Sequence, residues 1–173
     1  MEKNMSEFIT VTPETLSENS FKLIGKDWML ITAGDEKNYN TMTASWGGVG
    51  VLWNESVAFM FIRPQRYTFE FAEQNGLFTL SFFDEQYRSA LRFCGANSGR
   101  DCNKAEKTGL TPVHEDGLTY FAEAKLVLVC EKLYAQDLTA ESFIDKSIID
   151  KHYPNNDFHR MYVGKIVKCL KKA

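Results

Sequence analysis

A short segment, Asn40 to Gly48, constrains the fold more than any other part of the chain. Side chains on a β-strand alternate between its two faces, so hydroxyl residues would share one face and apolar residues the other. The hydroxyl face would hold Thr41, Thr43 and Ser45, and the apolar face Met42, Ala44 and Trp46. Two glycines follow, a residue type used where the backbone approaches another group closely. The pattern predicts either a strand that presents donors to an anionic or carbonyl-rich ligand, or a half-buried strand whose hydroxyls only face water.

Short strand patterns recur along the rest of the chain. We expect strands at Asp27–Thr32, Tyr39–Trp46, Val57–Arg63, Leu77–Phe83, Tyr120–Leu133 and Arg160–Leu170. The third is almost continuously apolar and hence buried on both faces, and Pro64 ends it because proline cannot donate to a sheet. In the last strand Tyr162, Ile166 and Leu170 lie four residues apart, which should place all three on one face.

A few helices separate these strands. We expect helices at Arg66–Gln74, closed by Asn75-Gly76, at Glu85–Phe93, and one turn from Lys104 to Lys107 that ends at Gly109. The segment Thr139–Asp150 is compatible with a helix or with a mixed loop. This succession predicts a mainly β protein with some α structure, built as a closed or partly closed antiparallel barrel.

The composition is that of one folded domain spanning residues 1–173, with 44% hydrophobic and 25% charged residues. The formal net charge of −3 gives no electrostatic argument for nucleic acid. No apolar run is long enough for a membrane span, and the polar start Met1–Glu7 lacks the apolar stretch of a signal peptide. We therefore expect a cytoplasmic protein with neither a nucleic-acid nor a membrane partner.

The four cysteines do not form a recognisable motif. They are Cys94, Cys102, Cys130 and Cys169, and no two of them have C-x-x-C spacing. This pattern argues against a zinc site and against a thioredoxin-like motif. We expect reduced thiols that pack as small apolar side chains, and no metal site.

Several motifs occur in a fixed order from about Gly25 to Val167. They are the Asn40–Gly48 segment, Ile62-Arg63-Pro64 with Tyr67-Thr68, Phe93-Cys94-Gly95, Ser98-Gly99-Arg100-Asp101, Lys104, Gly109-Leu110-Thr111-Pro112, and His159-x-x-Tyr162-x-Gly164. In this order they resemble the flavin reductase-like proteins of the FMN-binding split-barrel class, which include the flavoredoxins. The resemblance implies a six-stranded antiparallel split barrel with short peripheral helices. It also implies a homodimer that binds flavin near the subunit interface.

The resemblance implies a set of site residues as well. The implied FMN-binding residues are Thr41, Met42, Thr43, Ala44, Ser45, Trp46, Arg63, Tyr67, Thr68, Ser98, Arg100 and Lys104, and the implied catalytic residue is His159. The Thr43–Trp46 segment would meet the polar edge of the flavin ring, and Arg63 with Thr68 would meet the phosphate. His159 would lie near the flavin and the nicotinamide.

Each of these residues also has a simpler interpretation. Arg63 alone would be a surface arginine at a strand end, and His159 alone a structural or surface histidine. The chain also departs from the family pattern at three positions. Asn103 stands where Asp is usual, Ala105 where an aromatic residue often follows the lysine, and Lys165 where Glu is common.

The resemblance favours an FMN-dependent oxidoreductase that takes hydride from NADH or NADPH. The acceptor would be free flavin, ferric iron, a protein or a small molecule. The alternative is a flavoredoxin-like FMN carrier that transfers electrons without nicotinamide turnover of its own. A third interpretation is a barrel that has lost its ligand and serves only in assembly.

Overall fold

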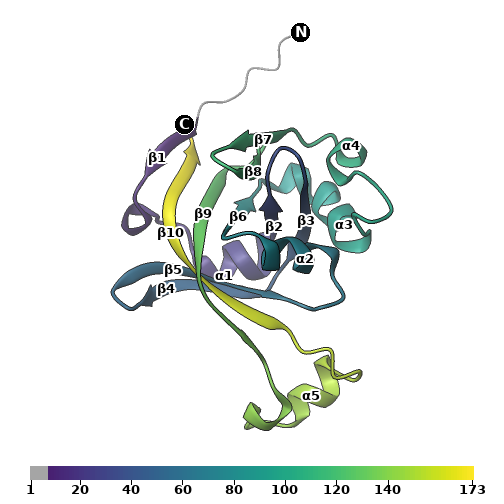
Figure 1. Cartoon of the computed structure of the whole chain (residues 1–173). Helices are drawn as coiled ribbons and strands as arrows, with labels where there is room; N and C mark the ends of the chain where they lie inside the picture. The colour runs from purple at the N-terminus through teal and green to yellow at the C-terminus, as the bar shows by residue number, and fades with distance from the viewer. Residues whose placement is uncertain (1–7) are drawn as a thin grey trace.

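In a computed structural model that describes residues 8–173, one antiparallel sheet organises the chain (Figure 1). Seven strands follow one another across it in this order: β3 (Tyr39–Ala44), β2 (Met29–Gly34), β6 (Leu77–Phe82), β9 (Leu126–Asp137), β10 (Arg160–Lys172), β5 (Glu55–Ile62) and β4 (Gly47–Leu52). A further strand, β1 (Phe8–Val11), also pairs with β10. The hairpin of β7 (Pro112–Glu115) and β8 (Leu118–Phe121) forms a second, small sheet, and β8 lies beside β6 and β2.

Strand β10 connects the parts of the main sheet. It pairs with β9 along one edge, and its other edge pairs with β5 through Arg160–Lys165 and with β1 through Cys169–Lys172. The mainly β, antiparallel class is confirmed, but the expected count of six strands is too low. The six predicted strands correspond to β2, β3, β5, β6, β9 and β10, and the described sheet adds β1 and β4.

Two predicted strands are shorter than expected. The strand from Tyr39 ends at Ala44, because Ser45 and Trp46 form a link to β4 that turns at Gly47, where φ is +155°. A Cβ at Gly47 would lie 2.8 Å from the carbonyl oxygen of Phe59. The predicted strand Tyr120–Leu133 is interrupted by a turn at 122–125 that separates β8 from β9.

The predicted common face of Tyr162, Ile166 and Leu170 is wrong for Leu170. The pairing of β10 with β9 shifts between Ile166 and Lys168, so Val167 is an extra residue on β10. One inserted residue reverses the alternation of side chains beyond it. Tyr162 and Ile166 therefore pack in one core cluster, while Leu170 packs in the other.

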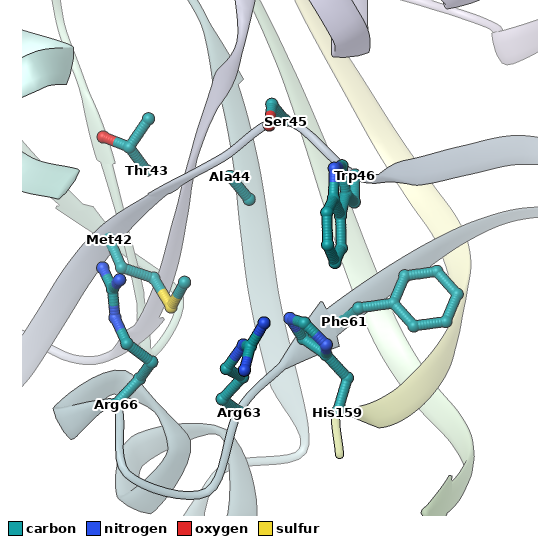
Figure 2. Close-up of a pocket in the computed structure, with 9 residues that line it drawn as sticks. All are labelled: Met42, Thr43, Ala44, Ser45, Trp46, Phe61, Arg63, Arg66 and His159. Carbon is teal, nitrogen blue, oxygen red and sulfur yellow. The ribbon is translucent and has the colours of Figure 1, made fainter. Parts of the chain in front are cut away.

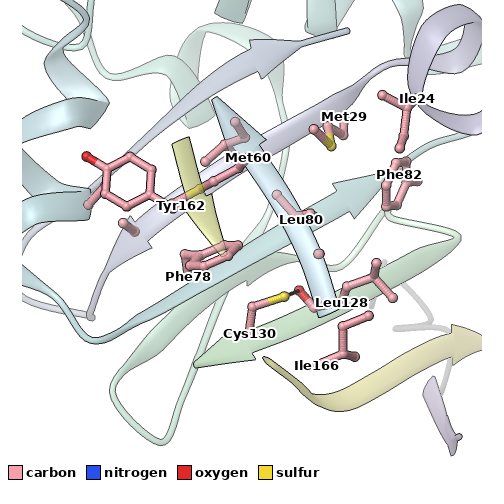
Figure 3. Packing of buried hydrophobic residues seen from close by; sticks show 14 of the residues in the cluster. Ile24, Met29, Met60, Phe78, Leu80, Phe82, Leu128, Cys130, Tyr162 and Ile166 are labelled. Carbon is pink, nitrogen blue, oxygen red and sulfur yellow. Dashed lines mark hydrogen bonds between the residues drawn. The ribbon is translucent and has the colours of Figure 1, made fainter. Parts of the chain in front are cut away.

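The first core cluster lies on the inner face of the sheet (Figure 3). Tyr162 and Phe78 are among its largest fully buried side chains. Gly164 lies against the Phe78 ring, and a Cβ there would come within 2.5 Å of that ring and 2.9 Å of the Cys130 Cβ. The glycine of the H-x-x-Y-x-G motif is thus required by packing.

Two of the short helices, at residues 67–74 and 88–96, pack against β2 and β3. The helices are α1 (Ser20–Lys22), α2 (Tyr67–Gln74), α3 (Arg88–Ala96), α4 (Lys104–Thr108) and α5 (Ser147–His152), with 3-10 turns at Pro13–Thr15, Glu85–Tyr87 and Ala140–Ser142 and a π-helical turn at Leu23–Asp27. Helix α4 ends as predicted, at a left-handed Gly109. Asn75, in contrast, ends α2 in an extended conformation. The segment Thr139–Asp150, for which the sequence allowed a helix or a mixed loop, consists of loop, a 3-10 turn and the start of α5.

Strands β9 and β10 continue past the other strands into an arm formed by residues 138–159, which carries α5 and projects at the bottom of Figure 1. No helix within residues 8–173 has the length and apolar character of a membrane span. The expectation that the chain has no signal peptide rests on residues 1–7. These lie outside the described residues. All four cysteines are free.

Candidate functional site

A cavity of about 190 Å³ opens where β3 passes into β4; we call it the Trp46 cavity. Its lining residues are Met42, Thr43, Ala44, Ser45, Trp46, Phe61, Arg63, Arg66 and His159. Figure 2 shows the Trp46 ring directed toward His159 and Arg63 on one side of the group, with Met42 and Arg66 on the other. Residues far apart in the sequence thus lie together at the C-terminal end of β3.

A second cavity of about 180 Å³ lies beside the first, and we call it the Thr68 cavity. It is lined by Asn40, Met42, Gln65, Arg66, Tyr67, Thr68, the loop 95–99 and Lys104. Met42 and Arg66 line both cavities, which therefore adjoin. The Thr68 cavity lies at the N-terminus of α2, where backbone N–H groups lack helical acceptors and the helix dipole favours an anion.

Arg66 is the functional candidate that the sequence analysis missed. It is the residue before α2, and its guanidinium makes one protein hydrogen bond, Nη2 to the carbonyl oxygen of Gly95 at 3.4 Å. Within residues 8–173, no carboxylate lies within ion-pair distance of it, so its charge is uncompensated. Burial, with Arg63 nearby, lowers the pKa of Arg66, yet an arginine remains charged. A cation of this kind beside a helix N-terminus is suited to an anionic group.

Arg63 has a different environment from the one expected of a phosphate ligand. Its Nη1 donates to Asp157 Oδ2 at 2.5 Å and its Nη2 to the carbonyl oxygen of His152 at 2.8 Å. The guanidinium also lies 5.0 Å from the ring centre of Tyr153. Arg63 lines the Trp46 cavity, and the Asp157 carboxylate of the arm balances its charge.

His159, the residue before β10, faces the same cavity and is 8% exposed. Its ring centre lies 5.2 Å from that of Trp46, and its Nδ1 is hydrogen-bonded to the Tyr153 hydroxyl at 2.7 Å. Burial, and to a lesser extent Arg63, lowers the pKa of His159 to about 4. The imidazole is therefore neutral at pH 7, able to donate from one ring nitrogen and accept at the other.

Two of the three hydroxyls in the predicted row donate to backbone carbonyl oxygens of the protein. The Thr43 hydroxyl donates to the carbonyl oxygen of Leu91 at 2.5 Å, because α3 covers this face of β3. The Thr41 hydroxyl donates to the carbonyl oxygen of Ile31 at 3.1 Å. Of the three, Ser45 lines the Trp46 cavity without a protein hydrogen bond to its hydroxyl in the described residues. The apolar face of the strand, with Met42 and Ala44, lies along the cavity as well.

Thr68 and Ser98 both line the Thr68 cavity. Thr68 is buried, and its hydroxyl oxygen accepts from Asn40 Nδ2 at 2.9 Å, which leaves the hydroxyl proton available to another group. Ser98 Oγ accepts from the backbone N–H of Arg100 at 3.2 Å. Tyr67 lines this cavity too, beneath the Arg100 guanidinium.

Lys104 and Arg100 are held by protein groups. Lys104 is buried, its Nζ donates to the carbonyl oxygens of Thr41 and Cys94, each at 2.8 Å, and burial lowers its pKa to about 8. Arg100 forms an ion pair with Glu70 and lines a third cavity of about 400 Å³ beside the first residues of β3.

Two departures from the family pattern have local explanations. Asn103 is the N-cap of α4, and its Oδ1 accepts from the N–H groups of Ala105 and Glu106, as an aspartate there would. Lys165 forms an ion pair with Glu55 at 2.9 Å, across the β5–β10 pairing. In residues 8–173, no cluster of His, Cys, Asp and Glu could hold a metal ion.

A family model for the flavin reductase like domain matches residues 21–172. The chain belongs to this family. A comparison with curated proteins finds no significant match. The expected membership of the flavin reductase-like class is thus confirmed, over nearly the whole described chain.

Solved structures give the same fold at low sequence identity. An FMN-binding domain of a flavin reductases-like enzyme from Shewanella baltica is 16% identical, with a TM-score of 0.69 over 96% of this chain and 78% of that one. Flavoredoxin of Desulfovibrio vulgaris (Miyazaki F) is 20% identical, with a TM-score of 0.65 over 92% and 73%. An NADH:FAD oxidoreductase from Streptomyces globisporus, in complex with NAD and FAD fragments, is 14% identical, with a TM-score of 0.62 over 84% and 74%. These values establish a shared fold.

Proposed function

We propose that this flavin reductase-like protein binds FMN, with its phosphate in the Thr68 cavity and its ring in the Trp46 cavity. The observation that carries the proposal is Arg66. It has an uncompensated charge, it precedes the N-terminus of α2, and it lines both cavities. A phosphate group joined to a flat ring through a ribityl chain matches this succession of an anion site and an apolar site.

The residues present fit such a cofactor. Arg66, the first N–H groups of α2 and the Thr68 hydroxyl would hold the phosphate. Trp46 offers an aromatic face, and Ser45 a hydroxyl and a backbone N–H, to the ring. Bound flavin supplies the redox chemistry, since it can accept a hydride and release electrons singly or in pairs, whereas the chain binds and orients it. The resemblance implied Arg63 as the arginine that binds the phosphate, whereas we propose Arg66 in that role.

We propose that NADH or NADPH reduces the bound flavin, and that a flavin, ferric iron, small-molecule or protein acceptor reoxidises it. The neutral imidazole of His159 lies at the ring end of the site, where it can orient an incoming nicotinamide. The flavoredoxin and the NADH:FAD oxidoreductase among the similar structures support an oxidoreductase role without choosing between the enzyme and the electron carrier.

Anaerobic mixing tests this proposal directly. The protein is loaded with FMN, freed of excess flavin, and mixed with NADH or NADPH in the absence of oxygen. Loss of the visible flavin absorbance with either nucleotide is expected for the enzyme. Retention of that absorbance with both, in a protein that dithionite still reduces, would identify the electron carrier instead. A protein that takes up no FMN would refute both functions.

We also propose that the chain acts as a homodimer with the flavin site near the interface. Strand β4 begins directly after Trp46, and its hairpin with β5 exposes Val51 (77% exposed) and Trp53 (55%). Exposed apolar side chains gathered on one projecting hairpin are typical of an interface. Sedimentation should give a dimer, and Val51→Lys should shift it toward the monomer. A monomeric wild-type protein would contradict this proposal.

A further inference from the structure

The arm places a tyrosine directly behind the histidine of the Trp46 cavity. Tyr153 follows α5, is 4% exposed, and its hydroxyl lies 2.7 Å from Nδ1 of His159. Since Nδ1 is engaged by the arm, Nε2 is the ring nitrogen that remains for the cavity (Figure 2). If Nε2 carries the proton, His159 offers the cavity a hydrogen-bond donor. If Nδ1 carries it, His159 offers an acceptor.

The surroundings of the Tyr153 hydroxyl decide this point. A neutral imidazole has one N–H, so either the phenol donates to a bare Nδ1 or an Nδ1–H donates to the phenol oxygen. In the second case the phenol proton would need another acceptor. In the described residues the Tyr153 hydroxyl has one hydrogen-bond partner, Nδ1 of His159. A buried O–H without an acceptor costs about 1–3 kcal/mol, so the first arrangement is favoured.

Tyr153 is held in place from several sides. Its ring packs against Phe158 and Phe143, with centres 5.0 and 5.8 Å away, and the Arg63 guanidinium lies over its face at 5.0 Å. Arg63 is itself fixed to the arm by its bonds to Asp157 and to the His152 carbonyl. The hydroxyl is thus directed at Nδ1 by a packed arrangement rather than by one flexible side chain.

We propose that Tyr153 is a positioning residue that fixes His159 as the neutral Nε2–H tautomer and so gives the Trp46 cavity one directed hydrogen-bond donor. A donor of this kind suits a carbonyl oxygen or ring nitrogen of an electron-accepting ligand. Use of the donor by flavin or nicotinamide rests on the proposed function, whereas the tautomer is a property of the chain alone.

Nitrogen NMR of the flavin-free protein measures the tautomer. In protein with ¹⁵N-labelled histidines, long-range ¹H–¹⁵N spectra distinguish a protonated from a bare ring nitrogen, and His159→Gln identifies the signals of His159. We expect a protonated Nε2 and a bare Nδ1 in the wild type at pH 7. A protonated Nδ1, or averaged signals from both tautomers, would overturn the proposal without any variant of Tyr153.

Tyr153→Phe then tests the role of the hydroxyl, since it keeps the ring and removes the donor. We expect His159 to lose its single tautomer, and its two nitrogen signals to move toward average values. The matched control is Tyr134→Phe, which removes an exposed tyrosine hydroxyl bonded to Gln136 and should leave His159 unchanged. A folded Tyr153→Phe protein with an unaltered Nε2–H tautomer would contradict the positioning role.

The consequence for the site is measured separately in FMN-loaded protein. Tyr153→Phe should slow flavin reduction by NADH or NADPH about tenfold while the FMN dissociation constant changes less than about threefold, and Tyr134→Phe should do neither. Unchanged reduction in the Tyr153 variant would refute the use of the donor. Failure of the wild type to bind FMN would refute the proposed function and leave the NMR result standing.

Discussion

The buried His159 should make the stability of this protein depend on pH in a way that one substitution removes. Burial lowers the pKa of His159 in the folded protein to about 4, whereas an unfolded histidine titrates near the ordinary 6.5. The unfolded chain therefore binds the extra proton first as the pH falls. The stabilising contribution is complete above about pH 6.5 and is lost as the pH falls toward 4.

The size of the effect follows from these two pKa values. Between pH 7 and pH 5, linkage predicts that the free energy of unfolding falls by at most about 2 kcal/mol because of His159 alone. Solvent screens this pKa shift little because the His159 side chain is only 8% exposed. The charged groups that also act on its pKa are Arg63, Arg66 and Asp157. Carboxylates elsewhere also titrate in this range, so the effect must be read as a difference between proteins.

Urea denaturation at pH 7, 6 and 5 measures that difference. We expect wild type to lose about 2 kcal/mol more than His159→Gln between pH 7 and 5, because glutamine does not titrate. The comparison variant is Ser45→Ala, which also alters the wall of the Trp46 cavity but removes no titratable group, and it should keep the wild-type dependence. Parallel pH profiles for wild type and His159→Gln would refute the reasoning.

Three further substitutions test other parts of the structure. Gly164→Ala would place a Cβ 2.5 Å from the Phe78 ring, so it should cost about 1–3 kcal/mol in urea denaturation; an unchanged midpoint would contradict the packing role. Lys104→Met would leave two carbonyl oxygens without their donor and should cost about 1–3 kcal/mol, whereas equal stability would show that water replaces the ammonium. Arg63→Gln should speed proteolysis of the arm more than it weakens FMN binding, and the reverse order would return Arg63 to the phosphate site.

Much of the sheet could be predicted from the sequence because its strands have strong local patterns. The apolar run that became β5 and the alternation in β3 both predicted strands at the right places. Strands β1 and β4 were missed. Strand β1 has only four residues, and β4 contains three glycines, so neither has a strong residue pattern. The shifted face of Leu170 depends on a bulge that exists only through pairing with β9.

The site was predictable as a neighbourhood but not in its detail. The motifs located Ser45, Trp46, Thr68 and His159 at adjoining cavities. Which arginine is free depends on partners distant in sequence, since Asp157 pairs with Arg63 while no described carboxylate pairs with Arg66. The signal that was available is the position of Arg66, directly before a helix N-terminus.

The central claim, a phosphate held by Arg66, is tested most directly by comparing FMN with riboflavin, which lacks the phosphate. Dissociation constants are measured by flavin fluorescence for wild type and Arg66→Ala. We expect wild type to bind FMN at least about tenfold more tightly than riboflavin, roughly 1.4 kcal/mol. Arg66→Ala should remove most of that preference and leave riboflavin affinity within about threefold of wild type. Equal affinity of wild type for the two flavins, or an equal loss of both in the variant, would contradict the account.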